Sequence, residues 1–556
     1  MNKSFFISLL AVILLSFFSF KSLIRPGYFP MHDDMQVIRL VEMDKCIRDG
    51  QIPCRWVPDL GYGYGYPLYN YYGPLSYYFM EAFHLAGFSF LDSIKAEIIL
   101  TFLASAVGMF LLGRSLWGEL GGVISALFYV YAPYRAADVY SRGAVGEFNA
   151  LIYLPLIFWG LLELIKTGRK RYFLAASISL AALLATHNIT SLIFLPFVLL
   201  WSILLIFYFK KRDLILKVFL SLAFGFCLAG FFILPVIIEK PLAHTESMIS
   251  GYFNYLAHYV SVGQLFFSTH WGYGPSELGP LDDASFSVGI FHWFFAVLAL
   301  IAGVIYRKIN RFSFLVLIFL GASGIISAFM IHPRSVFIWN RIEILSYLQF
   351  PWRFLVLVIF FFSLMGGGVV YFMRNNRFSV WTALVMTCLV ILFNAYYFTP
   401  ETWFDITDKE KTTGILWEKQ VTASIFDYLP IYAKAPPATA APEKPWSING
   451  EIKVLDYEKG TDWQKAKIEV VSDQAMIYWP QFYFPNFRVS VDGKLAPLSY
   501  DNDLGLITFT ADKGVHQINL KLYNSLVRSA GNILTLSSIL FIVGWLIYDR
   551  KNKKTL

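Results

Sequence analysis

The stretch that decides the fold is FFISLLAVILLSFFSFKSLIRPGYFPMHDD, residues 5–34. Its first part, 5–24, is almost wholly apolar and has about the 20 residues that a helix needs to cross a hydrocarbon core. The run is followed by Pro26 and then by two adjacent carboxylates, Asp33 and Asp34. No small-residue cleavage site follows it, so we interpret it as an uncleaved signal anchor. The stretch predicts a membrane-spanning helix with an acidic pair just beyond its outer end.

The composition extends this prediction to the whole chain. Of 556 residues, 57% are hydrophobic and only 15% are charged, against about 25% charged in a typical soluble protein. Twelve apolar runs are long enough to be read as spans: 5–24, 94–113, 119–137, 148–165, 171–187, 189–208, 215–238, 287–305, 312–331, 353–372, 379–398 and 529–548. The chain is therefore predicted to be an all-α polytopic membrane protein with about twelve transmembrane helices.

The positive charges indicate how the chain is oriented. Lys and Arg gather in short connections at 166–171, 210–212, 307–311 and 374–377 and in the tail 549–554. Cytoplasmic loops carry such an excess, so both termini are predicted to be cytoplasmic, in a cytoplasmic (inner) membrane. The net charge of +8 is then an orientation signal, not a sign of a nucleic-acid partner. The long loops 25–93 and 239–286 fall on the outer side, where we expect an extracytoplasmic active site.

Residues 399–528 have a different character. A Pro- and Ala-rich linker at 433–445 precedes short runs of alternating hydrophobicity, and Asp492-Gly493 is a typical hairpin turn. They predict a small extracytoplasmic β-sandwich, and domains at 1–398, 399–528 and 529–556. The last of these holds the final helix and a basic cytoplasmic tail. Four aromatic residues are either sandwich core, which we favour, or a glycan-binding surface: Trp479, Phe482, Tyr483 and Phe484.

The first outer loop contains the most informative motifs. Residues 35–48 and about 75–88 have apolar residues at helical spacing and predict two interfacial helices. Between them lies a Tyr-rich segment, 61–75, that includes Tyr66 and Tyr72. Cys46 and Cys54 also lie in this loop, where an oxidising exterior would permit a disulfide.

These elements carry a resemblance to known proteins. The anchor, the acidic pair, the two interfacial helices and the segment Gly73-Pro74-Leu75-Ser76-Tyr77-Tyr78 resemble the GT-C superfamily of membrane glycosyltransferases. More closely, the chain resembles the bacterial 6-pyruvoyl-tetrahydropterin-synthase-related membrane proteins. The matching segments are 61–75, 141–148, 186–188 and 349–354, and the element 484–487 with 491–493 is similar to a related membrane-protein family.

The resemblance implies an enzyme that transfers a sugar from a polyprenyl-phosphate donor to an extracytoplasmic glycan, lipid or protein acceptor. In the superfamily, the acidic pair has an assigned role. Asp33 or Asp34 would therefore act as the base of an inverting transfer. Arg353 and Arg142 are our candidates for the donor phosphate, because the guanidinium fork matches phosphate oxygens. The candidate substrate-binding residues are His32, Tyr66, Tyr72, Glu147, His187 and His270.

Each assignment has an alternative. The acidic pair is also a typical helix N-cap, as is Glu147, and the tyrosines are typical of a membrane interface. Arg353 and Arg142 are either interfacial anchors or ion-pair partners of Glu343 and Glu147. No cofactor is required by the sequence, and a divalent metal ion held by Asp33, His270 and Asp283 is an alternative arrangement. The competing functions are a transporter or flippase, which would need the broken helices and repeated halves of such proteins, and a noncatalytic membrane scaffold.

Overall fold

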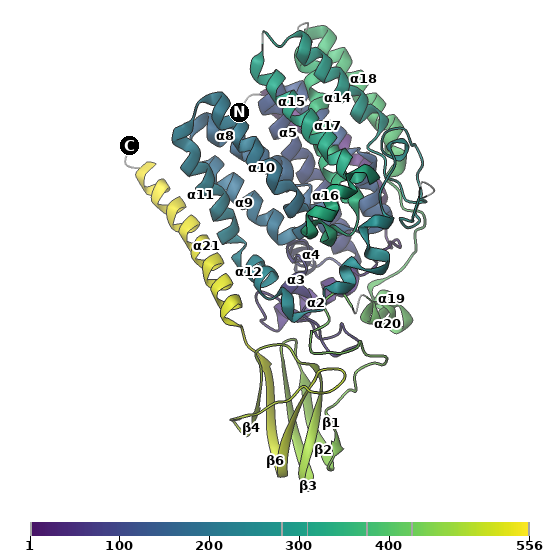
Figure 1. Cartoon of the computed structure of the whole chain (residues 1–556), viewed down its shortest axis with the longest axis vertical. Coiled ribbons are helices and arrows are strands. Elements are labelled where there is room, and N and C mark those ends of the chain that lie inside the picture. Colours follow the sequence, from purple (N-terminus) through teal and green to yellow (C-terminus); the bar gives the residue numbers. More distant parts are fainter. Residues whose placement is uncertain (1–2, 280–281, 309, 374–375, 424–425, 554–556) are drawn as a thin grey trace. The chain divides into compact units, whose positions relative to one another are not determined.

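The computed structural model describes residues 3–279, 282–308, 310–373, 376–423 and 426–553. Parts of three predicted basic segments, namely 309, 374–375 and 554, therefore lie outside the described residues. The described chain is mostly helical, with one antiparallel sheet near the C-terminus (Figure 1). It divides into two compact units. Unit 1 comprises Met1–Asp34, Gly87–Phe226 and Met248–Thr407, and unit 2 comprises Met35–Ala86, Cys227–Ser247 and Asp408–Leu556. These units cut across the predicted domain boundaries, which remain a prediction.

Unit 1 is a bundle of apolar helices around α17 (Leu355–Phe372). This helix is apolar on all sides and nearly every residue in it is buried, as expected for the centre of a bundle. Glycines allow close approach: a Cβ added at Gly121 of α5 would lie 2.9 Å from the Gly367 carbonyl oxygen. The other helices are α1 (Lys3–Leu15), α5 (Phe90–Val130), α6 (Pro133–Ala136), α7 (Val145–Ala150), α8 (Tyr153–Thr167), α9 (Lys170–Thr186), α10 (Asn188–Phe209), α11 (Ile215–Leu228), α13 (Val262–Phe266), α14 (Ile290–Ile305), α15 (Arg311–Ile331), α16 (Val336–Arg341) and α18 (Asn376–Asn394).

The predicted count of twelve membrane-spanning helices is not confirmed. Seven helical stretches of the described chain are long and apolar enough to cross a bilayer, or eight if a broken pair counts as one span, and one of the seven is the 41-residue α5. The predicted spans 94–113 and 119–137 both lie in α5, which Gly118 (φ 76°) breaks into two helices, and these pack against each other, since a Cβ added at Gly113 would lie 2.9 Å from the Ser125 Cβ. The predicted span 215–238 is broken at Ala229 into α11 and α12 (Gly230–Ile238). Helices α1, α9 and α14, with 13, 17 and 16 residues, are shorter than the run that crosses a hydrocarbon core.

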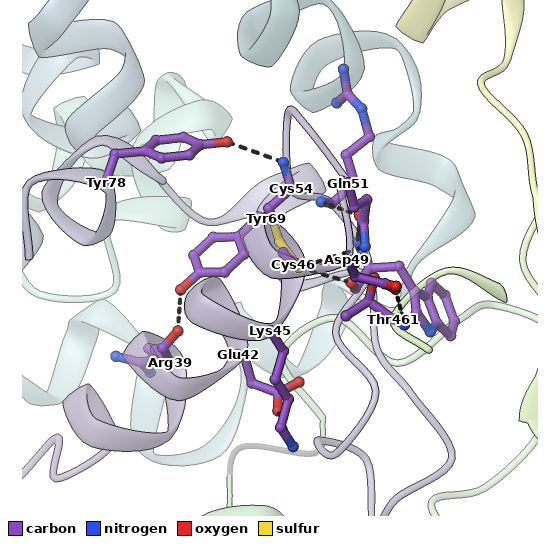
Figure 2. Close-up of a disulfide and its surroundings, with 12 residues drawn as sticks. Arg39, Glu42, Lys45, Cys46, Asp49, Gln51, Cys54, Tyr69, Tyr78 and Thr461 are labelled. Carbon is purple, nitrogen blue, oxygen red and sulfur yellow. Dashed lines mark hydrogen bonds and ion pairs between the residues drawn. A yellow bond between two sulfur atoms is a disulfide. The ribbon is translucent and has the colours of Figure 1, made fainter. Parts of the chain in front are cut away.

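Unit 2 contains the first outer loop. Both predicted loop helices are present, as α2 (Gln36–Arg48) and α4 (Leu75–Leu85), joined through the short α3 (Leu68–Tyr71). Cys46 and Cys54 form a disulfide that closes the turn after α2 (Figure 2). Just beyond α2, an Asp49 carboxylate oxygen accepts hydrogen bonds from the backbone and hydroxyl of Thr461, both at 2.7 Å, which ties this loop to the sheet (Figure 2). The unit also contains α12, α19 (Asp408–Lys411), α20 (Gly414–Thr422) and the terminal α21 (Leu526–Lys553), which packs on α12.

The strands of unit 2 confirm the predicted β-rich segment. They are β1 (Trp446–Asn449), β2 (Ile452–Lys459), β3 (Trp463–Phe482), β4 (Phe487–Val491), β5 (Lys494–Ala496) and β6 (Leu506–Leu522). They form one antiparallel sheet in the order β1-β3-β6-β4-β5, with β2 also paired to β3. The predicted turn at Asp492-Gly493 joins β4 to β5, and both residues have positive φ (50° and 80°), as a two-residue hairpin turn requires.

The apolar face of this sheet is covered in part by the first outer loop. Trp479, Phe482 and Phe484 are buried in the core of the sheet, as we favoured, and residues of the first outer loop share that core. The Trp56 ring, for example, lies 5.1 Å from the Phe487 ring in an edge-on contact. The described strands form one sheet, so the predicted sandwich is not confirmed.

Candidate functional site

The acidic pair is held against a short helical turn of unit 1. A π-helical segment, Ala137–Arg142, ends at Gly143, which has a left-handed φ of 66°. The His32 amide donates to the Ser141 carbonyl and the Asp33 amide donates to the Arg142 carbonyl, both at 2.9 Å. A side chain at position 143 is excluded by packing, since an added Cβ would lie 2.3 Å from the Met31 sulfur. The backbone before Asp34 is thus fixed to the backbone of Arg142.

Arg142 belongs to a buried cluster centred on Glu147. Its Nη1 and Nη2 atoms donate to the two Glu147 carboxylate oxygens, each at 3.2 Å. Arg353 comes from the 3₁₀ helix Pro351–Phe354, and its Nε lies 3.6 Å from the same carboxylate. The Glu147 side chain is only 2% exposed, whereas those of Arg142 and Arg353 are 14% and 13% exposed. Glu147 also lies in the first turn of α7, where a carboxylate complements the helix dipole, but the N-cap is Ala144, and a role of Glu147 as a site residue stays a prediction.

The cluster corrects one predicted pairing. Glu343 was an alternative partner for Arg353, but among the described residues Glu343 makes no ion pair, and Arg353 lies on Glu147 instead. The reason is tertiary: Glu343 begins a 3₁₀ segment, Glu343–Leu348, and is exposed there, whereas Glu147 is buried against both arginines.

A second carboxylate, Asp138, also contacts the Arg142 guanidinium. Burial raises the pKa of Asp138 well above its usual value, and the nearby Glu147 charge raises it further. Burial alone would lower the pKa of Arg142, but Glu147, Tyr134 and Asp138 outweigh that effect and raise it. Asp138 is thereby shifted toward its neutral form while Arg142 stays charged. Two guanidinium groups and two carboxylates thus meet in this cluster.

Aromatic rings hold the two guanidinium groups. The Arg142 guanidinium carbon lies 4.2 Å from the Trp352 ring centre, and that of Arg353 lies 5.2 Å from the Phe350 ring centre. Phe350 and Trp352 stack on each other at 4.6 Å. Cation–π contacts of this kind are stronger where water is excluded. They orient both arginines without using their N–H donors.

His187 lies near this cluster, close enough to Glu147, Arg142 and Arg353 to interact with their charges. It is also the N-cap of α10, because its Nδ1 accepts the Thr190 amide at 3.3 Å. Its position therefore has a structural explanation besides the predicted substrate contact.

The second outer loop reaches the acidic segment. The His32 Nε2 lies 2.5 Å from the Tyr273 carbonyl oxygen, and the His270 Nε2 lies 3.4 Å from an Asp283 carboxylate oxygen. The suggested metal site needed Asp33 beside this His–Asp pair. Within the ranges that the structure describes, no three His, Cys, Asp or Glu side chains are grouped so that they could hold a metal ion.

Tyr66 and Tyr72 belong to unit 2 and line a small cavity there, together with Met35, Arg39 and Tyr428. Tyr66 is buried, and its hydroxyl accepts the Tyr428 amide at 2.7 Å. Tyr72 lies under the Arg39 guanidinium at 4.5 Å. Both tyrosines therefore line a small cavity with polar and apolar walls, and their binding of substrate stays a prediction.

Four residues of the site were missed from the sequence. Tyr28 is buried, its hydroxyl has no hydrogen-bond partner among the described residues, and the charges of Asp34 and Asp33 act on it. The others are Tyr134, which donates to Glu147 at 2.5 Å, Asp138 and Trp352. Two of them had a sequence signal: Asp138 lies four residues before Arg142 on the same helical face, and Trp352 lies in the matching segment 349–354.

Comparisons with known proteins match a segment of the chain that includes most of these residues. Residues 69–342 match the family described as 6-pyruvoyl-tetrahydropterin synthase related domain; membrane protein. This confirms, over those residues, the family resemblance that the motifs indicate. The matched segment includes Arg142, Glu147, His187 and His270, and Arg353 lies beyond it. An uncharacterized protein of Lactococcus lactis subsp. cremoris (strain MG1363) is 26% identical over 266 residues, which cover 46% of this chain and 41% of that protein.

Three solved structures are also similar. Mycobacterial arabinofuranosyltransferase AftD has a TM-score of 0.46 at 13% identity, covering 72% of this chain and 27% of its own. The Archaeoglobus fulgidus oligosaccharyltransferase tethered with an acceptor peptide has a TM-score of 0.41 at 14% identity, covering 71% and 55%. ArnT from Cupriavidus metallidurans, bound to undecaprenyl phosphate, has a TM-score of 0.37 at 12% identity, covering 70% and 64%. The chain thus spans less than two thirds of each of these proteins.

Proposed function

We propose that this membrane protein is a glycosyltransferase that moves a sugar from a polyprenyl-phosphate donor to an extracytoplasmic acceptor with inversion. The acceptor hydroxyl oxygen attacks the anomeric carbon while the bond from that carbon to the phosphate oxygen breaks. The hydroxyl proton passes to Asp33 or Asp34, and polyprenyl phosphate leaves with the bonding electron pair. Bonds, proton and electron pair are thus accounted for without a cofactor.

One observation carries the proposal: the segment bearing the acidic pair is hydrogen-bonded to the backbone of Arg142, which is itself in the Glu147 cluster with Arg353. The candidate base and the candidate cationic site are thus linked by a direct backbone hydrogen bond. A leaving phosphate gains negative charge, and guanidinium groups already oriented by aromatic rings stabilise that charge without reorganisation.

The remaining substrate-binding candidates receive roles from their positions. His32 and His270 lie on the two segments where the second outer loop meets the acidic pair. Glu147 orients the arginines, His187 lies near them, and Tyr66 and Tyr72 line a cavity of unit 2. The location that we propose is the cytoplasmic membrane with both termini inside. The basic loops support it, as does the Cys46–Cys54 disulfide, since disulfides persist in oxidising compartments.

The test is transfer by the full-length protein in lipid nanodiscs. Labelled polyprenyl-phosphate sugars are offered with envelope glycans from the producing cells, and released polyprenyl phosphate is measured. Asp33→Asn, Asp34→Asn or the double change should lower the rate by about 10²–10⁴, the usual contribution of a general base. The matched control is Asp501→Asn, whose side chain is 90% exposed in unit 2. Full activity in the double variant would overturn the assignment.

A flippase is the second candidate, because one predicted span is broken at Ala229 and broken helices are typical of transporters. It predicts that the same nanodisc preparation releases no polyprenyl phosphate, whereas proteoliposomes move a labelled lipid-linked sugar between leaflets. Lipid movement without release would favour this candidate over the glycosyltransferase.

A further inference from the structure

A second concave site lies in unit 1, outside the residues proposed for the reaction. It has a volume of about 420 Å³ and is lined by Ile249, Tyr255, Trp339, Asn340, Glu343, Ser346 and Tyr347. Its walls are α16 (Val336–Arg341), the 3₁₀ segment that begins at Glu343, and short 3₁₀ turns of the second outer loop. The volume lies in the usual range for small-molecule sites, about 300–1,000 Å³.

The floor of this pocket is rigid and aromatic. The Tyr255 and Trp339 rings stack at 5.1 Å with an angle of 20° between their planes. Trp339 is 1% exposed, and its indole N–H donates to the Met330 carbonyl at 3.1 Å. The Tyr255 hydroxyl donates to the Asn340 side-chain oxygen at 2.6 Å. This bond fixes the Tyr255 ring and the orientation of the Asn340 amide. Both rings are therefore oriented before any ligand arrives.

The side chains that line the pocket favour one part of the proposed substrates, the sugar, over the phosphate and the polyprenyl chain. The Glu343 carboxylate is the one charged side chain among the lining residues, and it would repel a phosphate. Ile249 is the one aliphatic side chain in the lining, so a polyprenyl chain would find little apolar surface. Aromatic faces carry partial negative charge and attract the C–H faces of a ring. Amide, carboxylate and hydroxyl groups around them match the hydroxyls of a sugar.

The pocket is connected to the arginine cluster through packed rings. Trp339 lies 6.2 Å from Phe354, the residue after Arg353. Three residues before Tyr255, Tyr252 lies 6.0 Å from Phe350, which stacks on the Trp352 that supports Arg142. A ligand in the pocket would thus lie beside the elements that hold both arginines.

We infer that this pocket binds a neutral sugar ring of the acceptor, as a subsite separate from the reacting hydroxyl. Its assignment to the acceptor rests on the proposed glycosyltransferase function, whereas sugar binding itself does not. Glu343 excludes acidic sugars, and the partly exposed Tyr255 ring, backed by the buried Trp339, supplies the stacking surface.

The test is saturation-transfer NMR on the full-length protein in detergent micelles. The probe is the neutral oligosaccharide fraction released by mild acid from the envelope of the producing cells, with digalacturonic acid as the acidic comparison. The neutral fraction should receive saturation at its ring C–H protons, and the acidic disaccharide should not. Tyr255→Leu and Asn340→Ala should each reduce the signal at least fivefold, and Glu343→Gln should admit the acidic disaccharide.

Two controls separate this inference from the proposed function. Phe337→Ala changes an exposed residue of α16 that does not line the pocket, and should bind like the wild type. The Asp33→Asn, Asp34→Asn double variant should bind the neutral fraction normally while losing transfer. Absence of saturation in the wild type, equal binding by Tyr255→Leu and Asn340→Ala, or equal binding of the acidic disaccharide would overturn the inference. Binding without any transfer activity would overturn only the glycosyltransferase.

Discussion

Replacing Glu147 by Gln removes the charge that holds the arginine cluster together. The carboxylate is 2% exposed, binds both Arg142 nitrogens at 3.2 Å and lies 3.6 Å from Arg353. Removing one partner of a buried ion pair costs about 3–5 kcal/mol. Gln keeps the size and still accepts the Tyr134 hydroxyl, so we expect a loss near the lower end, about 3 kcal/mol. At roughly 2 °C per kcal/mol for larger chains, Tm should fall by about 6 °C.

If the arginines form an anion site, a bound phosphate should restore the stability that Glu147→Gln loses. In the variant, a bound polyprenyl phosphate would supply the missing negative charge between the two guanidinium groups. Ligand that binds only the folded state adds about 2.7 kcal/mol at a concentration of 100 Kd. We therefore expect polyprenyl phosphate to raise Tm more in Glu147→Gln than in the wild type, measured by intrinsic fluorescence during a thermal ramp.

The matched control is Glu239→Gln in unit 2. Glu239 makes an equally buried pair with Arg528, at 2.8 Å and with side chains 5% and 1% exposed. This variant should lose similar stability, because the geometry is comparable, but should gain no more from polyprenyl phosphate than the wild type does. If both variants respond equally to the ligand, or Glu147→Gln does not respond at all, the cluster is a structural ion pair and not a phosphate site.

Three further results are expected. Gly143→Ala should lower transfer at least tenfold with little change in secondary structure by circular dichroism, because the new Cβ would displace Met31 from the turn that holds Asp33; an unchanged rate would contradict this coupling. Reducing the disulfide, or changing Cys46 and Cys54 to Ser, should cost about 2–3 kcal/mol from the loop length alone and lower Tm, whereas an unchanged Tm would show that the hydrogen bonds around it suffice. Asp492 raises the pKa of His516, so this pair stabilises the β4–β6 region fully below pH about 6.5 and loses that effect as pH rises through the raised pKa. His516→Gln should therefore speed hydrogen exchange in β4 at pH 5.5, by a loss of protection of less than about 1 kcal/mol, and should have no effect at pH 9. An equal effect at both pH values would contradict the titration.

Several features of the site could be found from the sequence because their signals are local. Asp33 and Asp34 stand out where an apolar run ends, and Arg142 and Glu147 lie five residues apart in one motif. The hairpin at Asp492-Gly493 was predicted because only a few residue types tolerate positive φ at both turn positions. Each of these is decided within about ten residues of chain.

Other features depended on distant segments. The choice of Glu147 over Glu343 as the partner of Arg353 follows from which carboxylate is buried beside it, and no local pattern encodes burial. Hydropathy indicated twelve apolar runs, but it did not show that the run 215–238 breaks at Ala229 into α11 and α12. A loop remote in sequence shares the core of the sheet, and alternation along the strands does not indicate that contact.

The sequence by itself determined that this chain lies in a membrane, where its charges gather and which residues are chemically capable of acting as base or phosphate ligand. Those properties are set by side-chain type and by spacing along one helix or turn. The tertiary structure alone decided that two arginines share one buried carboxylate, that the acidic pair is fixed to the backbone beside them, and that Tyr255 and Trp339 stack at the floor of a pocket. Such contacts join segments far apart in the chain, and their energies come from excluding water around pairs that exist only after folding.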